Sequence, residues 1–262
     1  MTAAGHGEWT KLRTLPSTWW LLLAVVALTV GASAAAVGAL STGECPSPAQ
    51  CHEDTVKVSL TGAWLGQAAV TVLAVLSITG EYGTGTIRTT LTALPGRLRL
   101  LAAKAAVLAA LTAAAASVGV LGSLLAGRLL LPAGGFTAEN GYPPLSLTDG
   151  PTLRAAAGTV LYLTLVALLS LGVATALRDT AASVTAVLGL LYAYPLLTRM
   201  FADERWFERL DRIGPTTAGL AIQATRDLHR LPIGPWAGLA VLAGYAAGAL
   251  VLGGVALKGR DA

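Results

Sequence analysis

The chain has 262 residues, of which 54% are hydrophobic and only 12% are charged, with a formal net charge of +4. Soluble domains carry about 25% charged residues, so a water-soluble fold of this size would lack half of its usual polar surface. The composition therefore argues against a soluble domain and favours one membrane-embedded unit over residues 1–262.

Six stretches without Asp, Glu, Lys or Arg are long enough to cross a bilayer: residues 14–43, 58–80, 105–127, 155–177, 180–198 and 231–257. A helix of about 19–23 residues rises roughly 28–35 Å, which matches a hydrocarbon core of about 30 Å. The stretches are continuously apolar, unlike the alternating strands of a membrane barrel. We predict an all-α polytopic membrane protein with spans at about 17–40, 62–79, 102–125, 153–176, 181–198 and 235–257.

The N-terminal residues 6–16 precede the first span and place Trp9, Leu12 and Leu15 near one face. This pattern indicates a short interfacial helix on the membrane surface, with a disordered tail as the alternative. The apolar stretch that follows is longer than the roughly 7–15 residues of a signal-peptide core. A retained membrane anchor is therefore the better interpretation.

The first loop contains both cysteines of the chain, Cys45 and Cys51, separated by a short Pro-containing sequence. Disulfides persist outside the cytosol, and this spacing allows a small closed loop. The sequence leaves two possibilities open, a disulfide or a pair of free thiols.

After the second span, residues 80–101 form a polar segment, and residues 199–230 form another between the fifth and sixth spans. Within the latter, residues 203–213 place Trp206, Leu210 and Ile213 on one helical face, which predicts an amphipathic surface helix ended by Gly214. A second short helix is expected near 218–228. The motifs Gly62-xxx-Gly66 and Gly244-xxx-Gly248 have the spacing that lets helix backbones approach closely, although such matches also arise by chance in a Gly-rich chain.

The distribution of Lys and Arg indicates the orientation. The short segments on the side of both termini hold nine of these residues: Lys11, Arg13, Arg88, Arg97, Arg99, Lys104, Arg178, Lys258 and Arg260. The short segments on the other side hold three, namely Lys57, Arg128 and Arg154. The long 199–230 segment adds six arginines to that side but is the least informative one. The short loops predict a multi-pass protein of the cell membrane with both termini in the cytoplasm.

Several kinds of chemistry are absent from the sequence. No His, Asp or Glu lies well inside a span, so the ionisable relays of proton-coupled transporters and the catalytic groups of membrane proteases have no candidates. The chain also lacks a Gly-x-x-x-x-Gly-Lys-[Ser/Thr] phosphate-binding loop. We therefore expect no enzymatic activity, no bound cofactor and no metal in this chain, and no nucleic-acid partner.

The segment after the second span carries the most specific pattern. From Glu81 to Leu91 it reads Glu-Tyr-Gly-Thr-Gly-Thr-Ile-Arg-Thr-Thr-Leu, which resembles the cytoplasmic Glu-(aromatic)-x-x-Gly-Thr-x-(charged)-x-x-Leu signature of type-2 ABC exporter permeases. Residues 8–13 before Trp19 and Trp20 look like the interfacial elbow of the actinobacterial branch of this family. Residues 221–227, followed by 231–236, are also similar to that branch, so the resemblance spans the chain.

The resemblance implies that the segment forms a coupling helix that binds an ABC ATPase subunit. The residues it implies for that contact are Glu81, Tyr82, Gly85, Thr86, Arg88 and Leu91. The glycines in the segment favour a helix that begins only near Thr86. The alternative is a loop whose charges mark the membrane boundary.

The resulting hypothesis is a permease subunit of an ATP-driven exporter that pairs with a second copy or a paralogue. ATP and Mg would be bound by the partner ATPase, and membrane lipid would surround the spans. The apolar spans favour a hydrophobic or amphipathic cargo, and six polar residues within them are candidates to line its pathway: Gln67, Thr71, Tyr162, Thr164, Tyr192 and Tyr194. The alternatives are a stand-alone secondary transporter or channel, and a membrane scaffold subunit without cargo.

Overall fold

A computed structural model describes residues 7, 9–10, 14, 16–44, 51–86, 96–201 and 204–259. All regular secondary structure in this part of the chain is helical. Six of its helical stretches are long and apolar enough to cross a membrane. The chain is therefore an all-α polytopic membrane protein, and the predicted fold class is confirmed. Most of the predicted interfacial helix at 6–16 lies outside the described residues.

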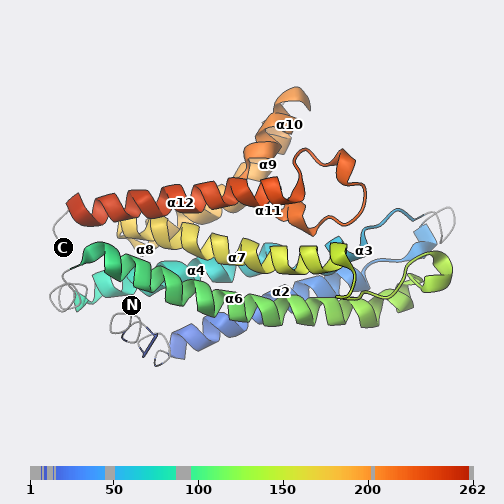
Figure 1. Ribbon diagram of the computed structural model, residues 1–262, viewed down its shortest axis with the longest axis horizontal. Helices are drawn as coiled ribbons and strands as arrows, with labels where there is room; N and C mark the ends of the chain where they lie inside the picture. The colour runs from blue at the N-terminus through green and yellow to red at the C-terminus, as the bar shows by residue number, and fades with distance from the viewer. Residues whose placement is uncertain are drawn as a thin grey trace.

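The spans run back and forth along one elongated bundle (Figure 1). They are α2 (Pro16–Gly38), α4 (Ala63–Gly83), α6 (Arg97–Leu130), α7 (Gly150–Leu177), a bent fifth span made of α8 (Thr180–Leu188), η5 (Gly189–Ala193) and α9 (Tyr194–Phe201), and α12 (Pro235–Gly259). Helix α2 begins and α12 ends at the same end of the bundle, here named the terminal end. The opposite, distal end holds α3 (Thr55–Ser59) and residues 131–149 and 221–234.

The helices on either side of the predicted 80–101 segment are longer than expected. Helix α4 continues through Gly80 to Gly83, and α6 already begins at Arg97 and runs for 34 residues. The predicted third span, 102–125, is only the apolar middle of α6. Its ends extend because Leu, Ala, Arg and Lys are strong helix formers, so the helix continues beyond the apolar stretch.

Helices α4 and α7 form the centre of the bundle. More than half of the apolar window of each is buried, 61% and 56%, against 17–33% in the other four spans. Helix α7 packs against α4, α6, α8 and α12. Its residues Tyr162, Leu163 and Val166 are completely buried. Polar side chains on the inner faces of α4 and α7 are therefore surrounded by protein and do not face lipid.

Small residues allow a close approach of α2 and α4. A Cβ atom added at Gly62 would lie 1.9 Å from the Thr29 carbonyl oxygen, and one at Gly66 would lie 2.3 Å from the Thr29 hydroxyl. The Gly62-xxx-Gly66 motif thus serves a contact within the chain. In contrast, no atom lies within 4 Å of a Cβ placed at Gly244 or Gly248.

The fifth span bends at η5, a single π-helical turn. The Tyr194 N–H donates to the Gly189 carbonyl five residues earlier, and Pro195 follows with no N–H to donate. In a regular helix that missing N–H would bond to the Leu191 carbonyl. This carbonyl instead accepts the Thr216 hydroxyl at 2.8 Å.

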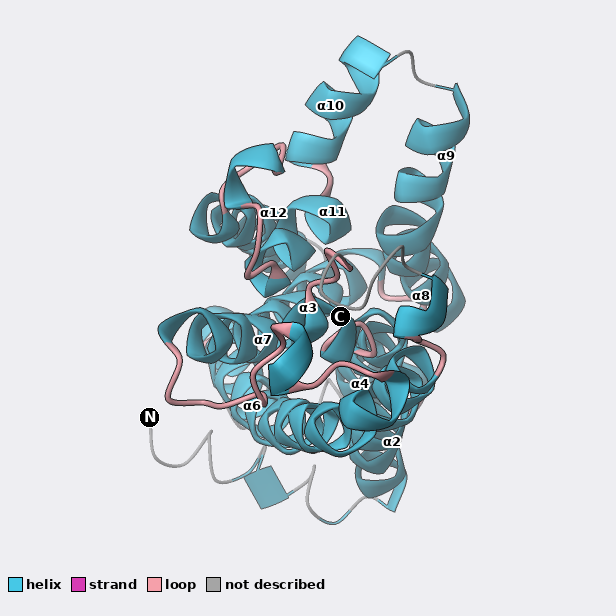
Figure 2. Ribbon diagram, turned by 90° about the vertical axis from the view of Figure 1, so that its right-hand side faces the viewer, coloured by secondary structure: helices cyan, strands magenta, loops and turns pink. Residues whose placement is uncertain are grey.

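Beyond the bend, α9 and α10 (Glu204–Ile213) leave the bundle together, as Figure 2 shows. The chain returns through α11 (Pro215–Leu220) and the 3-10 turn η6 (Ala221–Gln223). The helix predicted near 218–228 thus begins and ends earlier than expected. Pro215 starts α11 at its first turn, where its missing N–H costs nothing. The chain leaves the helix at Ala224, because the next two amides, of Thr225 and Arg226, donate to the carboxylate of Asp54, the residue that caps α3.

Candidate functional site

A polar cluster lies between α4, α7 and the bent fifth span, in the distal half of the bundle. Gln67 and Tyr162 are both 0% exposed, and the Tyr162 hydroxyl donates to the side-chain oxygen of Gln67. The Tyr192 hydroxyl lies beside Gln67 and donates to the Trp64 carbonyl. The Gln67 amide nitrogen has no hydrogen-bond partner among the described residues. A buried donor left unpaired costs about 1–3 kcal/mol, so an acceptor from water or a ligand would complete this cluster.

Thr71 extends the cluster toward the terminal end. It is completely buried, and its hydroxyl donates to the Gln67 carbonyl at 2.8 Å. The Ser170 hydroxyl of α7 lies 3.5 Å from the Thr71 oxygen. The structure therefore brings four of the six predicted pathway residues together.

The other two lie elsewhere. The Thr164 hydroxyl donates to the Val160 carbonyl within α7, and the Tyr194 hydroxyl donates to the Leu210 carbonyl of α10. Tyr194 thus holds α10 against the base of α9 and does not contribute to the polar cluster.

At the terminal end, a buried ion pair joins α4 to α6. The Lys104 ammonium donates to the Glu81 carboxylate at 2.9 Å and to the Ser77 carbonyl at 3.1 Å. The Lys104 side chain is 1% exposed and that of Glu81 is 13% exposed. Ionisable side chains within membrane helices are costly and are almost always paired. Glu81, which the resemblance implies as a contact to a second polypeptide, is thus directed into its own bundle.

Two arginines connect the neighbouring helix ends to α12. The Arg178 guanidinium lies 5.3 Å from the Tyr82 ring centroid and also donates to the Ala256 carbonyl at 3.2 Å. Arg97, at the start of α6, donates to the Leu257 carbonyl at 2.8 Å. Cations are stabilising at the C-terminus of a helix, where carbonyl groups lack helical partners. The ends of α4, α6, α7 and α12 are therefore linked at the terminal end.

The remaining residues of the predicted coupling segment lie at or beyond the end of α4. Gly85 has a φ of 71°, in the left-handed region that glycine adopts readily. The Thr86 hydroxyl lies 2.9 Å from that of Thr84, and both residues are exposed. Arg88 and Leu91 lie outside the described residues.

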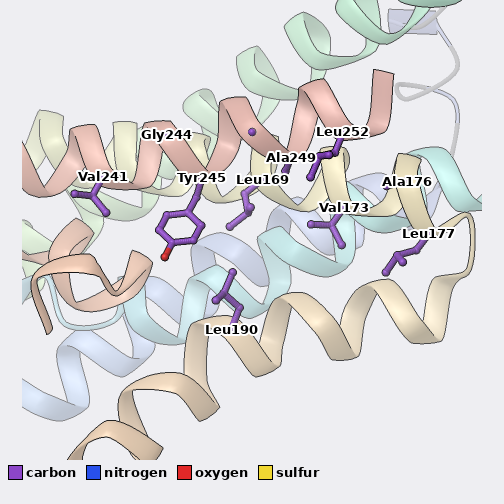
Figure 3. A pocket seen from close by; sticks show the side chains of 11 residues that line it. Leu169, Val173, Ala176, Leu177, Leu190, Val241, Gly244, Tyr245, Ala249 and Leu252 are labelled. Atoms are coloured by element: carbon purple, nitrogen blue, oxygen red, sulfur yellow. The ribbon is translucent and has the colours of Figure 1, made fainter. Parts of the chain in front are cut away.

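A lateral apolar groove runs between α7, α12 and the bent fifth span (Figure 3). Its volume is about 640 Å³. The lining residues are Leu169, Val173, Ala176, Leu177, Leu190, Val241, Gly244, Tyr245, Gly248, Ala249 and Leu252. Tyr245 points from α12 into the groove and is the only one with a polar side-chain atom. The two glycines leave the α12 wall open, so the groove presents almost only hydrocarbon.

At the distal end, the Asp54 carboxylate joins α3 to the 221–227 stretch. It accepts the Lys57 N–H at 3.0 Å, which caps α3, and also the Thr225 hydroxyl at 2.7 Å and the Arg226 N–H at 3.0 Å. In addition, the Gln223 side chain donates to the Leu60 carbonyl at 3.0 Å. The 221–227 stretch, which contributes to the resemblance, thus has a structural role in this fold.

The first loop, with its two cysteines, lies at the distal end. Cys51 is 4% exposed and disulfide-bonded, whereas Cys45 lies outside the described residues. No cluster of three or more His, Cys, Asp or Glu side chains suited to a metal occurs in the described ranges.

Comparison with known proteins adds no assignment. No protein-family model matches the chain, and no curated protein matches it either.

Proposed function

We propose that this chain is the membrane-spanning permease subunit of an ATP-driven exporter of the type-2 ABC class. The chain would lie in the cell membrane with its terminal end facing the cytoplasm. A separate ATPase subunit, which binds ATP and Mg, would associate with that end. A second copy or a paralogue of the chain would complete the transport pathway.

The Glu81–Lys104 ion pair carries the proposal. The segment with the exporter-like signature connects α4 to α6. The buried pair joins these two helices near the ends that flank the segment. Arg97 and Arg178 extend the connection to α7 and α12. A partner that displaces the segment would therefore move several helix ends together. This is the mechanical requirement for coupling ATP hydrolysis in one subunit to rearrangement in another.

The lateral groove and the polar cluster support a hydrophobic or amphipathic cargo. The groove offers apolar walls at the side of the bundle, where a cargo dissolved in the bilayer would arrive. The cluster around Gln67 offers hydrogen-bonding groups inside the bundle. An amphiphile needs both kinds of surface.

Co-purification of the tagged, full-length chain from its host tests the proposal. We expect wild type to bring down an ATPase subunit, and Arg88→Ala and Leu91→Ala to lose most of it. Arg128→Ala, near the distal end of α6, is the matched control and should retain the partner. If wild-type protein never co-purifies with an ATPase, the exporter assignment fails.

An ion-driven transporter is the second candidate, because a buried ionisable pair is also a common element of proton pathways. Proton uptake into dye-loaded proteoliposomes without ATP would favour it, provided that Lys104→Met abolishes the uptake.

A further inference from the structure

A small cavity, here named the loop cavity, lies at the distal end between the last turn of α6, the start of α3 and the loop that follows α6. Its volume is about 260 Å³, below the roughly 300–1,000 Å³ of sites for drug-sized ligands. Leu131, Phe136 and Leu145 give it apolar walls, and Thr55 and Thr137 are polar members of the lining. The loop cavity therefore fits a small chemical group better than a whole drug-sized molecule.

The loop after α6 is held in place by its own hydrogen bonds. The Phe136 N–H donates to the Leu131 carbonyl at 3.1 Å. The Tyr142 N–H donates to the Thr137 carbonyl at 3.0 Å. These bonds bring the rings of Phe136 and Tyr142 together edge to face, with centroids 5.0 Å apart and planes at 80°. The aromatic wall of the loop cavity is thus formed before any ligand arrives.

The loop cavity holds a cation that no protein group neutralises in the described part of the chain. Among the described residues that line it, Arg128 is the only charged one, and it is exposed. Arg97 and Arg178 donate to carbonyls at helix ends, whereas Arg128 has neither a hydrogen bond nor an ion pair with a described residue. Its guanidinium group presents a planar fork of N–H donors that matches the oxygens of a phosphate.

A second polar group of the loop cavity also lacks a partner. Tyr142 lines the cavity and is 4% exposed, and its hydroxyl is buried without a hydrogen-bond partner among the described residues. The Arg226 guanidinium lies 4.9 Å from the centroid of the same ring, which adds positive charge beside it. Since a buried donor without an acceptor is costly, a ligand with several anionic oxygens suits both Arg128 and Tyr142.

Helix α6 brings the loop cavity to the level of the lipid head groups. The 34 residues of α6 rise about 51 Å, compared with roughly 40–45 Å for a bilayer including its head groups. Arg128 belongs to the last turn of this helix. The phosphates of the distal leaflet therefore lie at the depth of its guanidinium group.

An apolar stripe on α6 leads to Arg128. It consists of Val118, Leu121 and Leu125, which are 50–59% exposed. Their spacing of three and four residues places them on one face of the helix, and Arg128 follows three residues later on the same face. Only 28% of the apolar window of α6 is buried within the bundle. The stripe is thus continuous with the lipid-facing surface of the spans and ends at a cation.

We propose that the loop cavity binds the phosphate group of a bilayer lipid from the distal leaflet. Arg128 and the Tyr142 hydroxyl donate to the phosphate oxygens, and one acyl chain of the lipid lies along the stripe of Val118, Leu121 and Leu125. The site holds one lipid at a defined position on the bundle. It goes beyond the proposed function and does not depend on it.

Native mass spectrometry of the delipidated, full-length protein in a non-ionic detergent tests the site. The probes are dioleoylphosphatidylglycerol and dioleoylglycerol, which share their acyl chains and differ by the phosphate-containing head group. We expect wild type to bind dioleoylphosphatidylglycerol at least about fivefold more tightly, as one ion pair at a partly exposed site provides.

Two variants and one control make the result specific. Arg128→Gln should weaken dioleoylphosphatidylglycerol about fivefold, and Tyr142→Phe should weaken it roughly three- to tenfold through the loss of one hydrogen bond. Neither variant should change the affinity for dioleoylglycerol. Lys57→Gln is the matched control, because it removes an exposed cation that lines a different distal cavity, and it should change nothing.

Inorganic phosphate tests whether a free anion is the ligand instead. We expect it to displace dioleoylphosphatidylglycerol only at concentrations far above that of the lipid, because it has no chain to lie on α6. Displacement by an equal concentration of inorganic phosphate would show that the loop cavity binds a free anion and would overturn the lipid assignment.

Equal affinity of wild type for the two lipids would also overturn the proposal, as would dioleoylphosphatidylglycerol binding that ignores both Arg128→Gln and Tyr142→Phe. An equal loss in Lys57→Gln would show a general effect of charge and reject the site. Should Arg128→Gln unfold, Tyr142→Phe decides alone, since it removes a single hydroxyl that has no partner in the described part of the chain.

Discussion

The Thr216 hydroxyl donates to the Leu191 carbonyl at 2.8 Å, between segments 25 residues apart in sequence. Pro195 leaves that carbonyl without its helical partner, and Thr216 of α11 supplies the missing donor while 2% exposed. The bend of the fifth span and the position of α11 are thus determined together. The lateral groove owes its shape to this bend.

Replacing Thr216 by Val should destabilise the fold by about 1–3 kcal/mol, because the buried Leu191 carbonyl would lose its donor. Thr216→Ser keeps the hydroxyl and is the matched control. The thermal unfolding midpoint of the detergent-solubilised chain measures the effect. Equal midpoints for the Val and Ser variants would contradict this account of the bend.

Breaking the Glu81–Lys104 pair should cost more. Lys104→Met leaves a mostly buried carboxylate without its cation, for which we expect a loss of about 3–5 kcal/mol. The double variant Lys104→Met with Glu81→Gln should lose less than Lys104→Met alone, since no uncompensated charge remains. Denaturant or thermal unfolding of the two single variants and the double variant gives the coupling free energy. Strictly additive effects would show that the two residues do not interact.

The two glycine motifs should respond differently to alanine. Gly62→Ala should destabilise by about 1–3 kcal/mol, because its Cβ would overlap the Thr29 carbonyl and force α2 and α4 apart. Gly244→Ala meets no atom within 4 Å and should be neutral or stabilising by up to about 1 kcal/mol. One unfolding assay compares the two variants. A greater loss of unfolding free energy in Gly244→Ala than in Gly62→Ala would show that the Gly244 face of α12 is covered.

Removing the Asp54 carboxylate should release the 221–227 stretch. In Asp54→Ala, the amides of Thr225 and Arg226 lose their acceptor, so hydrogen exchange in a peptide covering 221–230 should accelerate at least about tenfold, as the loss of a charge-assisted bond implies. Peptides at the terminal end serve as the internal control. Unchanged exchange in 221–230 would show that other contacts hold the stretch.

The fold could be predicted from the spacing of charges, because the hydrophobic thickness of a bilayer constrains length and polarity at once. Helix α6 is longer than predicted, since the spacing of charges locates where a helix is apolar and not where it ends. Arg97 was therefore assigned to the polar 80–101 segment and Lys104 to the start of the third span, although both lie within one helix.

The site was predicted in part. Tyr162 and Thr164 are two residues apart, and at about 100° per residue they point to nearly opposite sides of α7, so only one could face Gln67. The partnership of Lys104 with Glu81 needs the adjacency of α4 and α6, which no local pattern provides. Its only signal was an acid that ends one uncharged stretch and a lysine that precedes the next. Thr216 was missed because it follows a segment that was expected to lie on the surface.

The length of α6 has a consequence for how the protein sits in its bilayer. Arg97 and Arg128 are separated by roughly 46 Å along the helix axis, well beyond a hydrocarbon layer of about 30 Å. Helix α6 can therefore tilt by roughly 45° from the membrane normal before either guanidinium group enters the hydrocarbon layer. The tilt of this helix can therefore adjust to membranes of different thickness without desolvating the arginines near its two ends.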